Sequence, residues 1–440
     1  MNISEAKKEI INTVKAYLLK DEEGKYKIPE VRQRPILLMG PPGIGKTQIM
    51  EQIAAECNIG LVSYTITHHT RQSAVGLPMI DTEEYDGHEY SVTKYTMSEI
   101  IAGVYNAIRD EGKKEGILFI DEINCVSETL IPTMLQFLQC KTFGNQKIPE
   151  GWIIVAAGNP PEYNRSVREF DMVTLDRVRK IDIEANLNVW KEYATKKNIH
   201  GAILSYLDIR PGNFYKIEAE AEGISFVTAR GWEDLGALCR TYEELSIPFT
   251  YETIREYLQN DDVAEDFSAY YELYNKYKDD YKVDDILNGS ASSEVYRRIE
   301  NAQYDERIAL VHLILDSLSI KLANGKNVRK SVDDRYKEIK EIYSDKNSDE
   351  YKAEKEKFLV AAGKADELED SILDKINNSI KFVEENLEWT ELLVLITGLT
   401  MGKDSSMFLL EHQSDDYIRL SNSLVNGNKK IEIMKELENN

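Results

Sequence analysis

The sequence predicts an α/β domain with a parallel sheet, followed by a long helical region. Apolar, strand-like runs alternate with amphipathic helical stretches as far as about Ala185. A glycine-rich stretch, GPPGIGKT, separates the first strand from the helix that follows it. Beyond Ala185 almost the whole chain has helical patterning, with no repeat at a fixed period. Such alternation is typical of a parallel sheet that helices cover on both faces.

The elements of the first half follow from the spacing of apolar residues. An amphipathic helix is expected at Ser4–Leu19, because Ile10, Val14 and Leu18 recur at helical spacing. Five strands are expected at PILLMG, LVSYTIT, GILFIDEIN, GWIIVAAGNPP and KIDIE. Helices are expected at TQIMEQIAAEC, at MSEIIAGVYNAIRDEG, which a glycine ends, and at SETLIPTMLQFLQ. GLPMI and YSVTKY predict a hairpin around the turn-rich DTEEYDGHE, and KTFGNQKIP predicts a smaller one.

The second half reads as helices separated by IRPGN, LNGS and LANGKN. In ERIALVHLILDSLSIKL one helix face is apolar, with Ile308, Val311, Leu315, Leu318 and Leu322.

Composition restricts the partners and the compartment. The 440 residues carry a net charge of -23, which repels phosphate backbones, so nucleic acid is not expected as a partner. Four cysteines lie without paired spacing, which predicts reduced thiols and a cytoplasmic protein. The first residues do not have the pattern of a secretory signal. The longest apolar runs, WIIVAAG and LLVLITGL, are far too short to predict a membrane span.

GPPGIGKT, residues 40–47, matches the phosphate-loop pattern G-x-x-x-x-G-K-[ST]. Its glycines let backbone N–H groups surround phosphate oxygens, while Lys46 supplies positive charge and Thr47 a hydroxyl ligand for Mg²⁺. The helix that follows directs its positive dipole end to the same place. The predicted binding residues are Gly40, Pro41, Pro42, Gly43, Ile44, Gly45, Lys46, Thr47 and Gln48.

Two later strands end in polar residues. Asp121 and Glu122 end a buried strand about 75 residues after the phosphate loop, where Asp121 would hold the metal and Glu122 would polarise the attacking water. Asn159 ends the next strand, where its amide would contact the terminal phosphate or that water. A simple Asn-Pro turn is the alternative for Asn159.

In this order the motifs resemble the AAA+ ATPases, and specifically their MoxR-like branch. GPPGIGKT, SAVGLP, DEIN, GNPPEY, LDRV and TARGWEDL carry the resemblance over roughly residues 30–245. It implies an αβα core at 1–185, a helical lid at 186–290 and an all-α extension at 291–440 whose role it does not define. It also implies Mg²⁺-dependent ATP hydrolysis, a hexameric ring, a client protein and a partner with a von Willebrand factor A domain. The region around SAVGLP would lie near the central pore.

The resemblance also implies residue roles. Lys46 and Thr47 take the Walker A positions, Asp121 and Glu122 the Walker B positions, and Asn159 the sensor 1 position. Arg177 takes the place of the arginine finger that enters a neighbour's site, with Arg179 and Arg168 as rivals, and Arg230 takes the sensor 2 place. A surface ion pair is the alternative for each arginine. Cys125 departs from the family, in which an arginine often follows DEIN.

Three functions follow. The first is a chaperone-like ATPase, for which ATP rather than GTP is expected because the guanine-reading motif Asn-Lys-x-Asp is absent. The alternatives are a slow nucleotide-gated switch or scaffold and a nucleic-acid-dependent motor.

Overall fold

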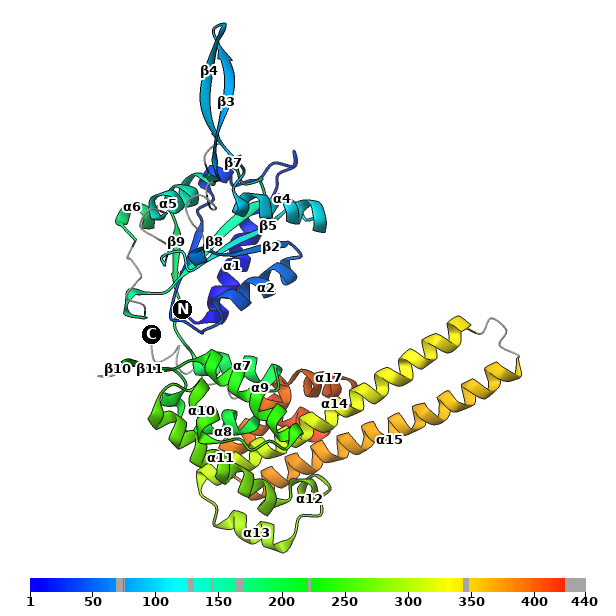
Figure 1. Ribbon diagram of the computed structural model, residues 1–440. Coiled ribbons are helices and arrows are strands. Elements are labelled where there is room, and N and C mark those ends of the chain that lie inside the picture. The colour runs from blue at the N-terminus through cyan, green and yellow to red at the C-terminus, as the bar shows by residue number, and fades with distance from the viewer. Residues whose placement is uncertain are drawn as a thin grey trace, which may run out of the picture. The chain divides into compact units, whose positions relative to one another are not determined.

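The chain folds into two compact units, seen in a computed structural model (Figure 1). The first comprises Met1–Val189 with Thr228–Arg230, and the second comprises Trp190–Val227 with Gly231–Asn440. The structure describes residues 1–68, 74, 76–125, 130–143, 146–163, 170–220, 223–342 and 348–423.

A five-stranded parallel sheet forms the centre of the first unit, in the order β2-β5-β8-β1-β9. The strands are β1 (Ile36–Met39), β2 (Gly60–Thr65), β5 (Gly116–Asp121), β8 (Trp152–Gly158) and β9 (Arg179–Asp182). Met39 is level with Gly158, and Ile120 is level with Ala156. The carboxyl ends of β1, β8 and β5 therefore lie side by side at one edge of the sheet. The parallel sheet predicted from the sequence is confirmed.

Helices cover both faces of this sheet, as the continuous burial of its strands requires. Alternate strand residues, including Leu37, Leu118 and Ile154, form a core with Ile100 and Phe137 of the helices on one face. The helices of this unit are α1 (Ile3–Tyr17), α2 (Lys46–Cys57), α4 (Glu99–Glu111), α5 (Ile131–Cys140), the one-turn α6 (Met172–Leu175) and α7 (Leu187–Lys196), which continues into the second unit. The αβα arrangement agrees with the expectation.

A long hairpin, β3 (Pro78–Tyr85) and β4 (His88–Tyr95), projects from this unit (Figure 1). The hairpin itself was predicted, but its turn is far shorter than expected. Asp86 and Gly87 both have positive φ, and Asp-Gly is a favoured pair for a two-residue turn whose twist matches the strands. The strands therefore continue through most of DTEEYDGHE. The smaller predicted hairpin is also present, as β6 (Thr142–Phe143) and β7 (Gln146–Lys147).

The second unit is mainly helical and packs around α14 (Tyr304–Ile342). Its other helices are α8 (Gly201–Ile209), α9 (Ala229–Leu245), α10 (Tyr251–Tyr257), α11 (Asp261–Tyr281), α12 (Val283–Leu287), α13 (Ser293–Glu300), α15 (Asp349–Asn386), α16 (Trp389–Met401) and α17 (Lys403–Glu411). The predicted breaks at IRPGN and LNGS are present.

Two expectations about the second unit are wrong. A hairpin, β10 (Lys216–Glu220) and β11 (Gly223–Val227), interrupts the helices where only helix was expected. In addition, α14 runs unbroken through LANGKN. A Cβ on Gly325 would lie 2.7 Å from Ile372 of α15, so the glycine here permits close helix packing. This packing offsets the low helix propensity that suggested a break.

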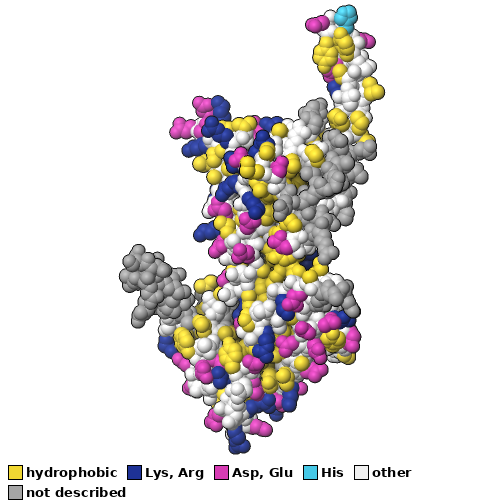
Figure 2. Space-filling view, turned by 90° about the vertical axis from the view of Figure 1, so that its left-hand side faces the viewer, with side chains coloured by type: hydrophobic (Ala, Val, Ile, Leu, Met, Phe, Trp, Pro, Cys, Tyr) yellow, Lys and Arg dark blue, Asp and Glu magenta, His cyan; other side chains and the backbone are white. Residues whose placement is uncertain are grey.

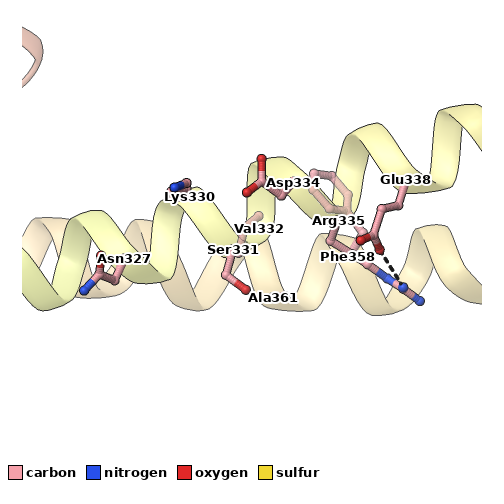
Figure 3. Close-up of a pocket in the computed structure, with 9 residues that line it drawn as sticks. All are labelled: Asn327, Lys330, Ser331, Val332, Asp334, Arg335, Glu338, Phe358 and Ala361. Carbon is pink, nitrogen blue, oxygen red and sulfur yellow. Dashed lines mark hydrogen bonds and ion pairs between the residues drawn. The ribbon is translucent and has the colours of Figure 1, made fainter.

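Beyond this point α14 and α15 form an antiparallel arm (Figure 1). Arg329 of α14 pairs with Asp366 and Glu369 of α15, and Tyr336 stacks on Phe358. The arm carries an open hollow of about 540 Å³ (Figure 3). Its described lining is mostly exposed, and four of the nine residues are charged, with Arg335 paired to Glu338 along the same helix, so this hollow lacks the enclosed apolar wall typical of a ligand site.

Helix α14 also has the length and composition that a membrane span requires. Of its most apolar window, however, 56% is buried within the protein, as in the central helix of a folded unit. By the same test α16 and α17 together qualify only as a pair bent by 83°.

Candidate functional site

The phosphate loop joins β1 to α2 at the carboxyl edge of the sheet, where the sequence places it. Gly43 and Gly45 have φ of 73° and 92°, a region that side chains disfavour. A Cβ on Gly43 would also lie 3.0 Å from Thr228. The loop therefore needs glycine at both positions. Of the remaining predicted binding residues, Pro41 and Ile44 are buried and Gln48 is exposed on the first turn of α2.

The Lys46 side chain turns back into this loop. Its Nζ donates to the carbonyl oxygens of Gly40 and Pro41 and to Oδ1 of Asn159, each at 2.8 Å. Burial lowers the pKa of Lys46 to about 8, because the desolvated ammonium is disfavoured, and the nearby charge of Arg230 lowers it further. Asp121 acts in the opposite direction. The ammonium is thus held where anionic phosphate groups would replace neutral acceptors and raise its pKa again.

Thr47 and Asp121, the two predicted metal ligands, lie together. The hydroxyl of Thr47 donates to Oδ2 of Asp121 at 2.8 Å. A hydroxyl and a carboxylate are ligands that Mg²⁺ accepts, and neighbouring ligands of an octahedral Mg²⁺ lie about 2.9 Å apart. These two residues therefore fit a shared magnesium ion. Among the described residues, no group of three or more His, Cys, Asp or Glu side chains offers another metal site.

Glu122 begins a tight turn directly after β5. Its φ is 57°, which is uncommon for a residue with a side chain and marks a position that its surroundings must hold. The turn closes through the N–H of Cys125, which donates to the carbonyl of Glu122 at 2.8 Å. The backbone N–H of Glu122 donates to Oδ1 of Asp121 at 2.9 Å, which orients the Asp121 carboxylate against the start of this turn.

Asn159 follows β8, which lies between β5 and β1 in the sheet. Its side chain contacts the phosphate loop, because Oδ1 of Asn159 accepts a hydrogen bond from Lys46. The simple-turn alternative does not account for this contact. The structure therefore brings together Lys46, Thr47, Asp121 and Asn159, with Glu122 next to Asp121.

Arg230 lies at the start of α9, and its backbone N–H donates to the carbonyl of Gly43 at 3.2 Å. Thr228–Arg230 belong to the first unit, although the chain on either side belongs to the second. The side chain of Arg230 is exposed, and its charge acts on Lys46. Arg230 therefore lies beside the phosphate loop at the start of a helix, and its sensor 2 role stays a prediction.

The three candidate finger arginines differ. Arg177 is exposed just after α6, and Thr174, with a smaller contribution from Arg177, lowers the pKa of Asp171. Arg179 is bound within its own chain, because it pairs with Glu9 and donates to the hydroxyl of Thr13 at 2.6 Å. Arg168 lies outside the described residues. Of the two arginines that the structure describes, Arg177 is the better suited to reach a neighbour.

Asn124 was not predicted from the sequence. This residue is 3% exposed, and its Nδ2 donates to the backbone carbonyl of Asn159 at 2.8 Å. The only signal in the sequence was a second amide residue near a strand end, in DEIN. Its contact depends on β5 and β8 being neighbours, and this cannot be read from the motif alone.

Comparison with known proteins agrees with this site. Residues 36–175 match the family model described as "ATPase family associated with various cellular activities (AAA)". The chain therefore contains an AAA domain, which supports nucleotide-dependent ATPase activity. The match is to the AAA family as a whole, so the MoxR-like branch stays a prediction.

A solved structure described as "Structural Basis for Katanin Self-Assembly" is also similar to this chain. It is 16% identical with a TM-score of 0.32, over 57% of this chain and 73% of that one. No curated protein matches the chain.

Proposed function

We propose that this protein is a magnesium-dependent ATPase of the MoxR-like kind, which assembles into a hexameric ring and uses hydrolysis to remodel or mature a client protein. The observation that carries the proposal is the hydrogen bond of Lys46 to Asn159 beside the Thr47–Asp121 pair. It supports a phosphate-binding site with a metal position and a neutral sensor in one place.

The residues divide the work of phosphoryl transfer. Backbone N–H groups of the loop and Lys46 bind the phosphates, while Thr47 and Asp121 hold Mg²⁺, which neutralises charge on the phosphate oxygens. Glu122 accepts a proton from the attacking water, and the amide of Asn159 orients that water or the terminal phosphate. Arg230 adds positive charge beside the loop.

A neighbouring subunit completes this site. Arg177 is exposed, and Met172 and Val173 of α6, a few residues before it in the chain, are 83% and 53% exposed. Exposed apolar side chains close in sequence to an exposed cation are typical of a surface that another chain covers. In a ring, this surface of one subunit would place Arg177 at the nucleotide of the next.

The β3–β4 hairpin is the proposed contact for a client or for a von Willebrand factor A domain partner. Its exposed apolar side chains include Ile80, which is 81% exposed, and the neighbouring Tyr85 and Tyr90 (Figure 2). The hairpin forms a separate two-stranded sheet, so both its edges offer unpaired backbone groups. We place the complex in the cytoplasm.

Mixing two inactive variants tests the proposal. Lys46→Ala lacks phosphate binding and Arg177→Ala lacks the finger, so each alone should be inactive. In a mixed ring, some interfaces pair an intact Lys46 with an intact Arg177 from the neighbour, so activity should partly return. The activity of the unmodified protein should also rise with its concentration and level off once rings form.

Tagged copies verify that the subunits exchange. Arg179→Ala is the control, because its contacts to Glu9 and Thr13 lie within one chain; mixed with Lys46→Ala, it should add no recovery beyond its own activity. Exchange without recovery by Arg177→Ala would move the finger elsewhere, for example to Arg168. Full activity of a monomer would overturn the ring. ATP binding without turnover would instead favour the switch, and stimulation by DNA or RNA would favour the nucleic-acid motor.

A further inference from the structure

We propose that Asn124 is a positioning residue that fixes Glu122 and Asn159 relative to one another. The inference rests on the proposed ATPase function, in which these two residues act on the same water and phosphate. It is carried by a set of contacts between the turn after β5 and the end of β8.

Glu122 has a backbone conformation that needs external support. Its positive φ is disfavoured for any residue with a Cβ, so the turn persists only where the surrounding contacts hold it. One such contact runs from the N–H of Ile123 to the carbonyl of Ala157 on β8, at 2.9 Å. The turn that carries the proposed base is therefore attached to the neighbouring strand.

Asn124 adds the second attachment, one residue after Ile123 in the turn and two residues after Ala157 at the end of β8. Its Nδ2 donates to the carbonyl oxygen of Asn159 at 2.8 Å. The two hydrogen bonds, Ile123 to Ala157 and Asn124 to Asn159, join the turn that carries Glu122 to the segment that carries Asn159. Since the Asn159 side chain also binds Lys46, these contacts connect the turn to the phosphate loop.

The two polar atoms of the Asn124 amide differ, because only the Nδ2 donor has a hydrogen-bond partner in the described part of the chain. Its Oδ1 is buried and has no hydrogen-bond partner among the described residues. Turning the amide over would place an oxygen against the Asn159 carbonyl, so the observed orientation is the better of the two. An unpaired buried oxygen is unfavourable, and an apolar residue would avoid it. Packing alone therefore does not explain an asparagine here.

Gly158 provides the space for this arrangement. A Cβ on Gly158 would lie 2.4 Å from Oδ1 of Asn124, which is closer than atoms can approach. Adding a methyl group at residue 158 should therefore displace the Asn124 side chain without removing it. Two substitutions, one in the turn after β5 and one on β8, can thus break the same bond.

The expected defect is in turnover rather than in binding. Small misplacements of reacting groups reduce rates by up to about 100-fold. Asn124→Ala and Gly158→Ala should each lower kcat by about 10- to 100-fold, while the Kd for ATP, measured with Mg²⁺ by calorimetry, stays within about threefold. Asn124→Asp, which keeps the shape and loses the donor, should be at least as defective as Asn124→Ala.

Matched controls lie on α4 of the same unit. Asn106 is exposed, and Gly103 has room for a methyl group, with its nearest neighbour at 3.4 Å. Asn106→Ala and Gly103→Ala should keep the kcat of the unmodified protein. Thermal unfolding of all variants shows whether they are folded at the assay temperature.

Separate outcomes identify which idea fails. A folded Asn124→Ala or Gly158→Ala protein with unchanged kcat would overturn the positioning role. Parallel losses of kcat, ATP affinity and thermal stability would also overturn it, because they indicate a purely structural role. If Glu122→Gln retains full turnover, the proposed ATPase mechanism itself fails; if it is inactive while Asn124→Ala is normal, only the positioning role is lost.

Discussion

Buried polar groups occur in both units of the protein, but they serve different ends. In the second unit, two buried polar side chains pair across packed helices. Arg307 of α14 pairs with Glu391 of α16 at 2.6 Å, and His312 of α14 with Asp208 of α8 at 2.8 Å. Glu391 and His312 are 0% and 5% exposed, so removing the partner of either would leave a buried polar group uncompensated.

At the sheet edge of the first unit, polar groups contact one another on a glycine-rich loop instead. Lys46 binds two carbonyls of its own loop and Asn159, and Thr47 binds Asp121. These contacts join no helix to another, and phosphate and Mg²⁺ would replace them. Burial alone therefore does not distinguish a structural charge from a functional one; the two differ in which parts of the protein their contacts hold together.

The largest expected effect is on ATP turnover, and it tests whether the polar residues at the sheet edge of the first unit are functional. Glu122→Gln should lower kcat by about 10³-fold, because the amide keeps the shape but does not accept a proton from water. ATP binding, measured by calorimetry, should be unchanged. The variant should also trap nucleotide and client together during purification. Normal steady-state hydrolysis would remove Glu122 from the mechanism.

The second prediction is that a change at Lys46 weakens ATP binding and leaves the free energy of unfolding nearly unchanged. Lys46→Ala should weaken ATP binding by about 100-fold, since a charge-assisted contact to the phosphates is lost. The free energy of unfolding should change by less than about 1 kcal/mol, because the ammonium holds only carbonyls and an amide of its own site. Calorimetry and urea unfolding measure the two quantities. A large loss of stability would place Lys46 with the structural charges.

The polar residues at the carboxyl edge of the sheet could be predicted from the sequence, because each belongs to a short motif of consecutive residues. A glycine loop, an Asp-Glu pair and an Asn-Pro step each follow an apolar strand, and parallel strands bring their carboxyl ends to one edge. The role of Asn124 was not predictable, because its contact depends on which strands are neighbours and on the space left by Gly158.

The second unit was predictable only in its helical character. Gly325 looked like a helix break, but tertiary packing against Ile372 keeps α14 continuous. The β10–β11 hairpin was missed because its short strands, KIEAE and GISFV, lack the long apolar runs that identified the central sheet. They form a two-stranded sheet separate from the central one, and most of their described residues are exposed or half-buried, so no buried face imposed a clear alternation.

The third prediction is that a change at Asp316 in the second unit lowers stability and leaves ATP affinity unchanged, the opposite of the result expected for Lys46→Ala. Asp316 accepts hydrogen bonds from the Gly201 N–H at 2.8 Å, from Arg240 at 2.7 Å and from the Tyr274 hydroxyl at 3.3 Å. Asp316→Ala should lower the free energy of unfolding of the second unit by about 2 kcal/mol, because these donors lose their shared acceptor. ATP affinity of the folded protein should be unchanged. A loss of affinity with unchanged stability would contradict the structural assignment.

The smallest effect concerns a residue that is not buried in either unit. Met172 is 83% exposed at the start of α6, so replacing it should not affect folding of one chain. If a neighbouring subunit covers it, burial of its side chain contributes about 1.5 kcal/mol to assembly. Met172→Asp should therefore raise the protein concentration at which ATPase activity is half-maximal by about tenfold. Val31→Asp is the matched control, because Val31 is 95% exposed in the short 3-10 helix Glu30–Arg32 of the same unit. Light scattering measures assembly directly in both variants. An equal shift in both would indicate a general effect of added charge, whereas no shift in Met172→Asp would place the neighbour's contact elsewhere.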